Sequence, residues 1–551
     1  MDDRRSADRD LEQARAALDR GEMHHAADHL AGAIAQAPTR PETHELLSRL
    51  AARAGGALEL FPLEQHAFVG TVVARAHLLA AAGRPEDGLP LLAAASGHTP
   101  GVDWAGVPWV IDPGLGARME PGLLARTIMQ LCTAVGDPAL DAGRLVLRPY
   151  LTVVRHAVAV HPEHPLLLGA GSALARRVGE ADLAVAWAAR GARLRPSKLA
   201  EIWLGYAYRS AGRVPESLAA LRRAVTHDPD DLSVYADIAG TLADHGRLDD
   251  ALQWVDRALA RDPTFDCAVH TAHRLRYRAD GDLAHLVRLA DFQRDHPDDS
   301  HEHTDLAECC ADVPWLSRVP SAPDTPIDPV RPRLATARPS ATATERLRRI
   351  AHPVWPHPPA VYDAALGLVL VEPEELLALL VYPPEAPDTE VGRALAEHDP
   401  ALWGRCAQVW ACLGLLHQCT DEPWAASTRR RLLVELTTTG TDRITEAAMF
   451  ALVTYAWVDP EARADVAALV AARLTDIAAA GRRPHLPGRR ADQRAASIAW
   501  SIAQLALATP DLDEATRDLA AAIIRADEQY APPIRPRRRR FLRWLRGPAT
   551  R

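Results

Sequence analysis

A glycine followed seventeen residues later by a proline recurs five times in the first half of this sequence. The five pairs are Gly21/Pro38, Gly83/Pro100, Gly179/Pro196, Gly212/Pro229 and Gly246/Pro263. The last three pairs follow one another at intervals of 33 and 34 residues, and Gly281/Pro297 continues the series one residue short. A fixed period of this length indicates a repeated structural unit, which constrains the fold more than any other feature of the chain.

Each unit is predicted to be a pair of antiparallel helices. Glycine ends the first helix, because it adopts a left-handed backbone at little cost, and proline stops the second helix from continuing. In 232–265 the small residues Ala251 and Ala258 let the two helices approach closely. One face of such a hairpin stays uncovered until a neighbouring hairpin stacks on it. The sequence therefore predicts an all-α solenoid.

These units resemble tetratricopeptide repeats, whose period is about 34 residues. The family pattern has a bulky residue, a Leu/Gly pair, a Tyr, two Ala and a terminal Pro. The matching residues are Leu204, Gly205, Tyr208, Ala224 and Pro229 in 198–231, and Tyr235, Ile238, Ala239, Leu242, Ala251, Ala258 and Pro263 in 232–265. The match is strong over 165–265, holds in 7–40 and 69–102, and weakens in 266–299, while Glu201 and Ser217 depart from it. The resemblance implies a right-handed α-solenoid that binds a protein or peptide segment.

Irregular segments divide this array. Residues 1–102 are expected to hold the N-terminal hairpins and 163–312 to continue the solenoid. Between them, 103–162 contains the Pro/Gly-rich stretch "VDWAGVPWVIDPGLG" and is expected to carry an insertion or a lengthened helix, which would make 1–102 a semi-independent lobe. In 313–344 proline recurs every few residues without an apolar period, so this segment is expected to be a stiff, solvated linker or an extended arm.

Residues 345–530 are expected to form a second helical domain. Three segments there combine an apolar helix, a proline and an amphipathic helix, and in each a large apolar residue lies ten residues before the proline. The pairs are Leu413/Pro423, Phe450/Pro460 and Trp500/Pro510. The units differ in length, so both a degenerate armadillo/HEAT-like stack and an ordinary helical bundle remain open.

One face of the first helix in each hairpin is predicted to line a concave groove, because residues three or four apart share a helix face. Arginine can bind a carboxylate through two parallel hydrogen bonds, and Trp and Tyr supply rigid apolar anchors, so this face suits an acidic or C-terminal peptide segment. The structural alternative is that the rings belong to the hairpin core and the arginines are solvated. The candidate residues are Arg176, Arg177, Trp203, Tyr206, Arg209, Arg274, Tyr277 and Arg278.

The chain ends in an Arg-rich basic tail, residues 531–551. Residues 535–551 contain eight Arg and no acidic residue, and the rest of the chain carries a net charge of −17, because the whole carries −9. A solvated end is the simplest expectation. The alternatives are an anionic membrane surface or an acidic protein surface, including the body of this chain, while nucleic acid is the least favoured partner. The residues considered for these contacts are Arg537, Arg538, Arg539, Arg540, Phe541 and Trp544.

Composition argues against several enzyme classes. The only lysine is Lys198, whereas a GxxxxGK[ST] phosphate loop, a kinase strand lysine and a Schiff-base lysine each need a lysine in its own sequence context. The sequence contains no HExxH or GxSxG motif. The clusters His24, His25, His29 and His301, His303, Cys309, Cys310 lack a zinc-ligand spacing, so neither a metal nor a cofactor is expected.

Seven cysteines without a CxxC pair and the lack of an apolar leader favour a reducing cytoplasm. The bias towards Arg, Ala and Pro is typical of a GC-rich bacterial genome. The sequence as a whole predicts a non-catalytic interaction scaffold or adaptor. Two alternatives remain open: a regulatory sensor that responds to a small ligand or a peptide, and an enzyme with its site in 345–530.

Overall fold

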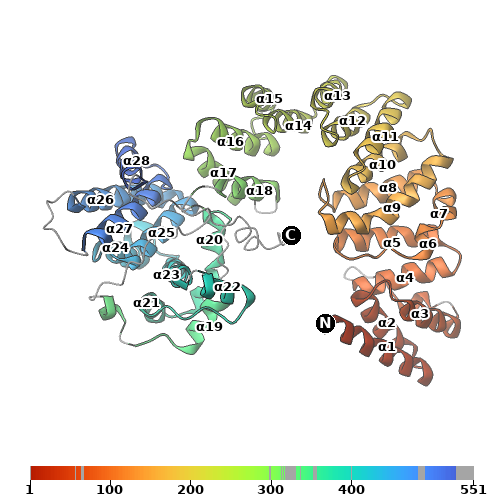
Figure 1. The fold of residues 1–551 in the computed structure, drawn as a ribbon, viewed down its shortest axis with the longest axis horizontal. Coiled ribbons are helices and arrows are strands. Elements are labelled where there is room, and N and C mark those ends of the chain that lie inside the picture. Colours follow the sequence, from red (N-terminus) through yellow and green to blue (C-terminus); the bar gives the residue numbers. More distant parts are fainter. Residues whose placement is uncertain are drawn as a thin grey trace. The chain divides into compact units, whose positions relative to one another are not determined.

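The computed structural model describes residues 2–55, 57–63, 67–296, 300–311, 331–335, 337–350, 356–398, 400–481 and 491–528, together with positions 313 and 316 (Figure 1). Within these residues the secondary structure consists of α-helices and short 3-10 helices, without a strand, which confirms the predicted all-α fold. The chain forms two compact units, Met1–Arg261 and Asp262–Arg551.

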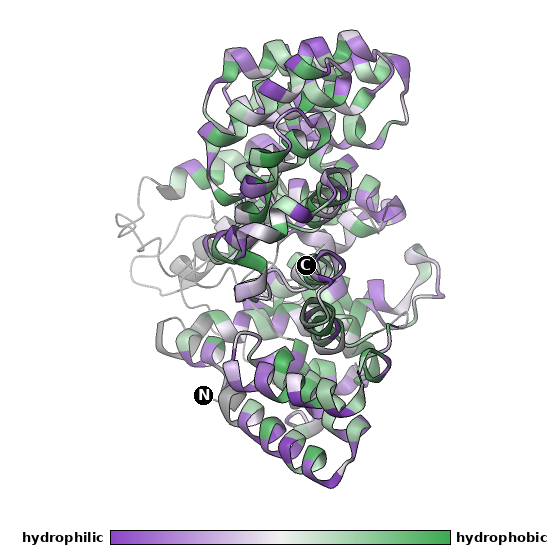
Figure 2. Ribbon diagram, turned by 90° about the vertical axis from the view of Figure 1, so that its right-hand side faces the viewer, coloured by the Kyte–Doolittle hydropathy of each residue, from purple (hydrophilic) through white to green (hydrophobic). Residues whose placement is uncertain are grey.

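Polar and apolar residues alternate along the helices, as expected for amphipathic elements that bury one side (Figure 2). In the described part of the chain, no helix combines the length and the apolar character needed to span a membrane.

The first unit consists mainly of helical hairpins. Its elements are α1 (Asp2–Arg20), α2 (Met23–Gln36), α3 (Pro41–Ala54), η1 (Leu58–Leu60), α4 (Val69–Ala81), α5 (Pro85–His98), α6 (Pro108–Ile111), α7 (Pro113–Arg118), α8 (Pro121–Thr133), α9 (Asp141–Val160), α10 (Pro165–Val178), α11 (Ala181–Leu194), α12 (Lys198–Ser210), α13 (Val214–His227), α14 (Leu232–Ala243) and α15 (Leu248–Arg261). The helices of the predicted hairpins α1/α2, α4/α5, α10/α11, α12/α13 and α14/α15 pack against each other (Figure 1).

The glycines of the repeat take the predicted role at the turns. Gly21, Gly83, Gly179, Gly212 and Gly246 have φ between +71° and +89°, a left-handed conformation that side chains disfavour. Inside the hairpin α12/α13, Gly205 faces Leu221 so closely that a Cβ at position 205 would lie 2.8 Å from the leucine side chain. The small residues Ala251 and Ala258 are fully buried where α15 meets α14, as the close approach of the helices requires.

The first unit has one continuous apolar core that runs from Leu11 to Ala220. The helix α5 packs against α8, which carries this core through 103–162. A semi-independent lobe of residues 1–102 is therefore not observed. The irregular segment consists of the short helices α6 and α7, which pack against the 20-residue helix α9, and of a turn at 134–140 between α8 and α9.

The second unit begins with the last predicted hairpin. Its elements are α16 (Asp266–Asp280), α17 (Leu283–Asp295), α18 (Ser300–Cys310), η2 (Arg331–Leu334), α19 (Ala341–Ile350), α20 (Pro358–Ala364), η3 (Leu366–Leu370), α21 (Pro373–Val381), α22 (Glu390–His398), α23 (Pro400–Leu416), η4 (Trp424–Ala426), α24 (Thr428–Thr438), α25 (Arg443–Val458), η5 (Pro460–Ala462), α26 (Arg463–Gly481), α27 (Ala491–Leu507) and α28 (Glu514–Glu528).

The helix α25 lies at the centre of this unit. It contacts α17, α20, α23, α24, α26 and α27, and 14 of its 16 residues are buried. A helix enclosed by so many others is typical of a bundle, whereas in a repeat stack each unit contacts only its neighbours. The predicted helix pairs are present around it, with Leu413 and Phe450 buried.

The boundary between the two units follows Arg261, whereas the sequence predicted one uninterrupted solenoid over 163–312. The helix α17 packs against α25, Arg294 donates a hydrogen bond of 2.8 Å to the carbonyl of Val458, and Arg463 forms an ion pair with Asp291. The hairpin α16/α17 therefore shares the apolar core of the second unit. Sequence periodicity could not show this, because the contacts join residues about 170 positions apart.

The segment 313–344, expected to be a solvated linker, has both exposed and buried residues: Arg333, Arg338 and Ser340 are exposed, whereas other residues are buried. Leu316 and Arg331 are each only 1% exposed, and α19 already begins at Ala341. Most of 313–330 lies outside the described residues.

Candidate functional site

Three successive first helices of the hairpins, α10, α12 and α14, meet around Tyr206. The guanidinium carbon of Arg176 lies 5.1 Å from the centroid of the Tyr206 ring, and that of Arg209 lies 4.9 Å from it. The Tyr206 hydroxyl donates a hydrogen bond to the Asp237 carboxylate on α14. The structure therefore brings together three of the predicted residues, on consecutive repeats of one compact unit.

The side chains of Arg176 and Arg177 bind the turn at 134–140 and its flanking residues. Arg176 is 5% exposed and forms an ion pair with Asp137. Arg177 donates hydrogen bonds to the backbone carbonyls of Cys132 (2.8 Å) and Val135 (3.1 Å). The prediction that these two arginines line an open groove does not hold, because the turn packs on the last turn of α10 and engages both side chains, although the buried Nε of Arg176 has no hydrogen-bond partner.

Arg209 differs from these two arginines. It is partly exposed, it stacks on Tyr206, and it forms no ion pair and donates no side-chain hydrogen bond within the described residues. Its guanidinium is thus held at one place by the ring while its donors remain available to another molecule.

The carboxyl group of Asp237 is buried beside these cations. Burial raises its pKa, whereas the hydrogen bond from Tyr206 and the charges of Arg209 and Arg176 act in the opposite direction. Burial also raises the pKa of Tyr206, so its hydroxyl keeps its proton and acts as the donor. The cluster therefore couples a buried acid to a partly exposed arginine through one tyrosine.

Trp203 has a packing role. A Cβ at Gly169 would lie 1.9 Å from two atoms of the Trp203 ring, so the indole of α12 rests directly on the backbone of α10. The ring is partly exposed. This placement fits the structural alternative for Trp203 and accounts for the glycine at 169 inside a helix.

The remaining three candidates lie on α16 in the second unit. Arg274 forms an ion pair of 2.7 Å with Asp305, which also accepts a hydrogen bond of 2.8 Å from His270. Tyr277 is partly buried against the apolar core, and this burial raises its pKa. Arg278 is exposed. These residues belong to another compact unit and are not part of the Tyr206 cluster.

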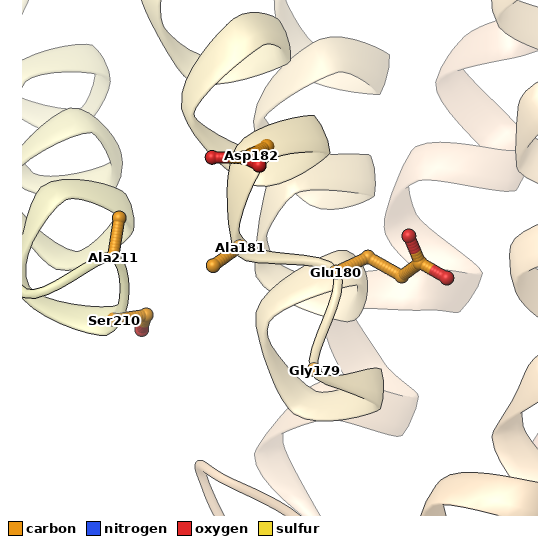
Figure 3. A pocket seen from close by; sticks show the side chains of 6 residues that line it. All are labelled: Gly179, Glu180, Ala181, Asp182, Ser210 and Ala211. Atoms are coloured by element: carbon orange, nitrogen blue, oxygen red, sulfur yellow. The ribbon is translucent and has the colours of Figure 1, made fainter.

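Two pockets lie within the units. The first, of about 350 Å³, lies between neighbouring hairpin turns and is lined by Gly179, Glu180, Ala181, Asp182, Ser210 and Ala211. Figure 3 shows the Asp182 carboxylate on the side of Ala211 and Ser210, while Glu180 points away. The second, of about 500 Å³, is lined by Pro383, Pro384, Glu385, Ala386, Pro387, Asp388, Gly392, Arg393, Trp403, Gly404 and Arg443.

The predicted tail residues Arg537, Arg538, Arg539, Arg540, Phe541 and Trp544 lie outside the described residues. The same holds for the side chains of His301 and His303. In the described ranges, no three His, Cys, Asp or Glu side chains are placed to hold a metal ion.

Two residues of the site escaped the sequence analysis. Asp237 lies on the first helix of its hairpin, and a search for acids on that face could have found it. Asp137 lies in an irregular turn and reaches Arg176 only through the packing of that turn, so no sequence pattern indicated it.

The comparisons with known proteins agree with the repeats. A family model described as tetratricopeptide repeat matches residues 204–264. No curated protein matches the chain. A solved tetratricopeptide repeat protein from Parabacteroides merdae is 11% identical, with a TM-score of 0.30, over 55% of this chain and 99% of that one.

Two further solved structures are also similar. YrrB, described as a TPR protein with an unusual peptide-binding site, is 16% identical, with a TM-score of 0.25, over 34% of this chain and 91% of that one. TTC0263, a thermophilic TPR protein from Thermus thermophilus, is 18% identical, with a TM-score of 0.20, over 43% of this chain and 99% of that one. The family model covers most of the hairpins α12/α13 and α14/α15, whose turns and packing follow the repeat, so residues 204–264 of this chain are similar to tetratricopeptide repeats.

Proposed function

We propose that this protein is a non-catalytic protein–protein interaction scaffold, and that the first helices of its repeats at 165–243 bind a segment of a partner. The observation that carries the proposal is Arg209, which stacks on Tyr206 and forms no ion pair or side-chain hydrogen bond within the described residues. A cation that is oriented and whose N–H donors are unused is the arrangement that a binding site for a carboxylate needs. A tetratricopeptide fold is suited to such binding, because its surface is formed before the partner arrives.

The partner segment is proposed to carry a carboxylate, either an acidic side chain or a C-terminus. Such a group can accept two parallel hydrogen bonds from Arg209, while the neighbouring ring excludes water from one side. Arg176 and Arg177 are not assigned to the binding site, because Arg176 is buried against Asp137 and Arg177 donates to backbone carbonyls.

The proposed location is a reducing compartment such as the cytoplasm. None of the seven cysteines, all of which lie in the described ranges, forms a disulfide, and Cys132, Cys310, Cys406 and Cys412 are buried. A basic tail that contacts an acidic or membrane surface also remains a proposal.

The test compares two charge reversals in the full chain. Arg209→Glu removes the proposed anchor, and Arg222→Glu, on the exposed side of α13 in the next helix, is the matched control. Partners captured from native cytosol are quantified by isotope labelling, and one enriched partner is mapped to a segment whose affinity is then measured. We expect Arg209→Glu to weaken binding of that segment at least tenfold, and Arg222→Glu to change it less than twofold.

Thermal unfolding of both variants verifies that they remain folded. Equal losses in the two variants, or an unchanged affinity after Arg209→Glu, would remove Arg209 from the binding site. Amidation of a C-terminal segment, or replacement of its acidic residues, distinguishes the two sources of the carboxylate.

A second candidate function is favoured by the pocket in the second unit. Its volume of about 500 Å³ lies in the range of small-molecule sites, and Arg393, Arg443 and Trp403 lie at its wall. A ligand-responsive sensor or an enzyme with its site in 345–530 would use this pocket. Thermal-shift measurements of the full chain against a metabolite collection test it, and Gly404→Leu, which fills the pocket, should abolish any shift. A shift that persists in Gly404→Leu would rule out this pocket.

A further inference from the structure

A second surface stands out on η3 in the second unit. Its side chains Leu366, Val369 and Leu370 are 58%, 40% and 69% exposed, although their chemistry favours burial. Glu372 and Glu374 follow directly, are exposed, and form no ion pair within the described residues. An exposed apolar cluster with a charged edge marks an interaction site. We call these five residues the η3 patch.

The patch is held firmly. Leu368, between the exposed residues, is fully buried, and η3 packs against α23. The Gln418 amide on the loop after α23 donates hydrogen bonds of 3.1 Å to the carbonyls of Val369 and Val371. The apolar side chains therefore face solvent from a fixed backbone. Binding of a partner would cost little conformational entropy at this surface.

Neither glutamate at the patch edge forms an ion pair with the neighbouring helix α19, whose partly exposed Arg346 also forms no ion pair within the described residues. Its Arg348 donates to the carbonyl of Glu385, at 3.0 and 3.1 Å, and its Arg349 pairs with Glu345. These guanidinium groups are engaged elsewhere. The patch thus combines an apolar centre with an acidic edge, and its complement is an apolar segment with a basic edge.

We propose that the occupant of the η3 patch is the tail of this same chain, residues 535–551. The tail contains the apolar residues Phe541, Leu542, Trp544 and Leu545 among eight arginines and no acid. The apolar residues would cover the exposed leucines, and the arginines would face Glu372 and Glu374. Charge complementarity selects this segment, because the rest of the chain carries a net charge of −17.

The tail is long enough to reach the patch. Phe541 follows the end of α28 at Glu528 by thirteen residues, which span at most about 43–47 Å when extended. The path of packed elements from α28 to η3 runs through α27, α25 and α23. Four such steps of about 8–10 Å each amount to about 32–40 Å. The tail therefore spans the separation across the packed layers, and the proposed contact does not depend on the binding surface proposed for the first unit.

The test places a photo-crosslinker on the tail of the full chain. Trp544 is replaced by p-benzoylphenylalanine, the dilute protein is irradiated, and crosslinked peptides are identified by mass spectrometry. We expect most crosslinks to fall on 363–374 within one chain, and their yield to drop severalfold in 0.5 M salt. Leu370→Ser together with Glu374→Lys should reduce this yield at least fivefold.

The matched control is Leu140→Ser, which removes an exposed leucine from the first unit and should leave the yield unchanged. Crosslinks elsewhere on the chain, or between two chains, would overturn the proposal. So would crosslinks that form only when phosphatidylserine vesicles or a DNA duplex are added, because the tail would then serve a membrane or a nucleic acid.

Discussion

The buried Arg331 provides the sharpest test of how the second unit is held together. Its Nε and Nη2 donate to the two oxygens of Asp442, at 3.1 and 3.2 Å. Nη1 donates to Thr439 Oγ1, and Nη2 also donates to the Leu436 carbonyl and to Thr445 Oγ1, each at 2.8 Å. Arg331 and Asp442 are each 1% exposed. One side chain from a proline-rich segment thus joins the end of α24 to the start of α25.

Replacing Arg331 with Met removes the cation that forms the buried ion pair with the Asp442 carboxylate. Removing one partner of a buried ion pair costs about 3–5 kcal/mol, although here Asp442 keeps the backbone hydrogen bonds from Ile444 and Thr445. Such a loss is a large part of the stability of an ordinary domain, about 5–15 kcal/mol. Arg331→Lys retains the charge but not the planar fork, and should cost less, about 1–3 kcal/mol.

The assay is native-state hydrogen exchange of the full chain, because two compact units do not share one free energy of unfolding. Amides of α25 report the second unit and amides of α14 the first, which should not change. Arg333→Met, on the exposed side of the same short helix, is the matched control and should stay within about 0.5 kcal/mol. The double variant Arg331→Met/Asp442→Asn should lose less than Arg331→Met alone. If Arg331→Met lowers the opening free energy of α25 by less than about 1 kcal/mol, or no more than Arg333→Met does, the argument from the buried pair fails.

Three further predictions concern the first unit. Burial lowers the pKa of His77 to about 3, so the folded state favours the neutral imidazole. The free energy of unfolding is therefore highest above pH 6.5, and it falls by about 1.4 kcal/mol per pH unit as the pH drops from 6.5 to about 3. Native-state hydrogen exchange of the α4 amides in His77→Phe should show a shallower pH dependence of the opening free energy over this range, and an unchanged slope would contradict the assignment. Gly169→Ala should destabilise the unit by about 1–3 kcal/mol in the same assay, because the methyl group meets the Trp203 ring. Gly240→Ala, in open space inside α14, should instead be neutral or stabilising by up to about 1 kcal/mol, and equal effects of the two substitutions would refute the packing argument.

The sequence by itself determined the hairpins. The spacing of Gly and Pro indicated where each first helix ends and where each second helix stops, because glycine adopts the left-handed turn at little cost and proline disfavours continuation of a helix. The pattern predicted the six hairpins between residues 2 and 295, including the positive φ of Gly281. It also indicated the helix pairs beyond 400, since an apolar period and a proline are local properties of the chain.

Only the tertiary structure decided which arginines are available for binding. Arg176 and Arg209 are both arginines on the predicted groove face of a first helix. A turn from an irregular segment places Asp137 against Arg176, whereas Arg209 receives no such carboxylate from that turn. The proline-rich segment likewise looked solvated, although it delivers Arg331 into a fully buried site. Contacts between distant residues decide these cases, and a local pattern carries no information about which distant groups will meet.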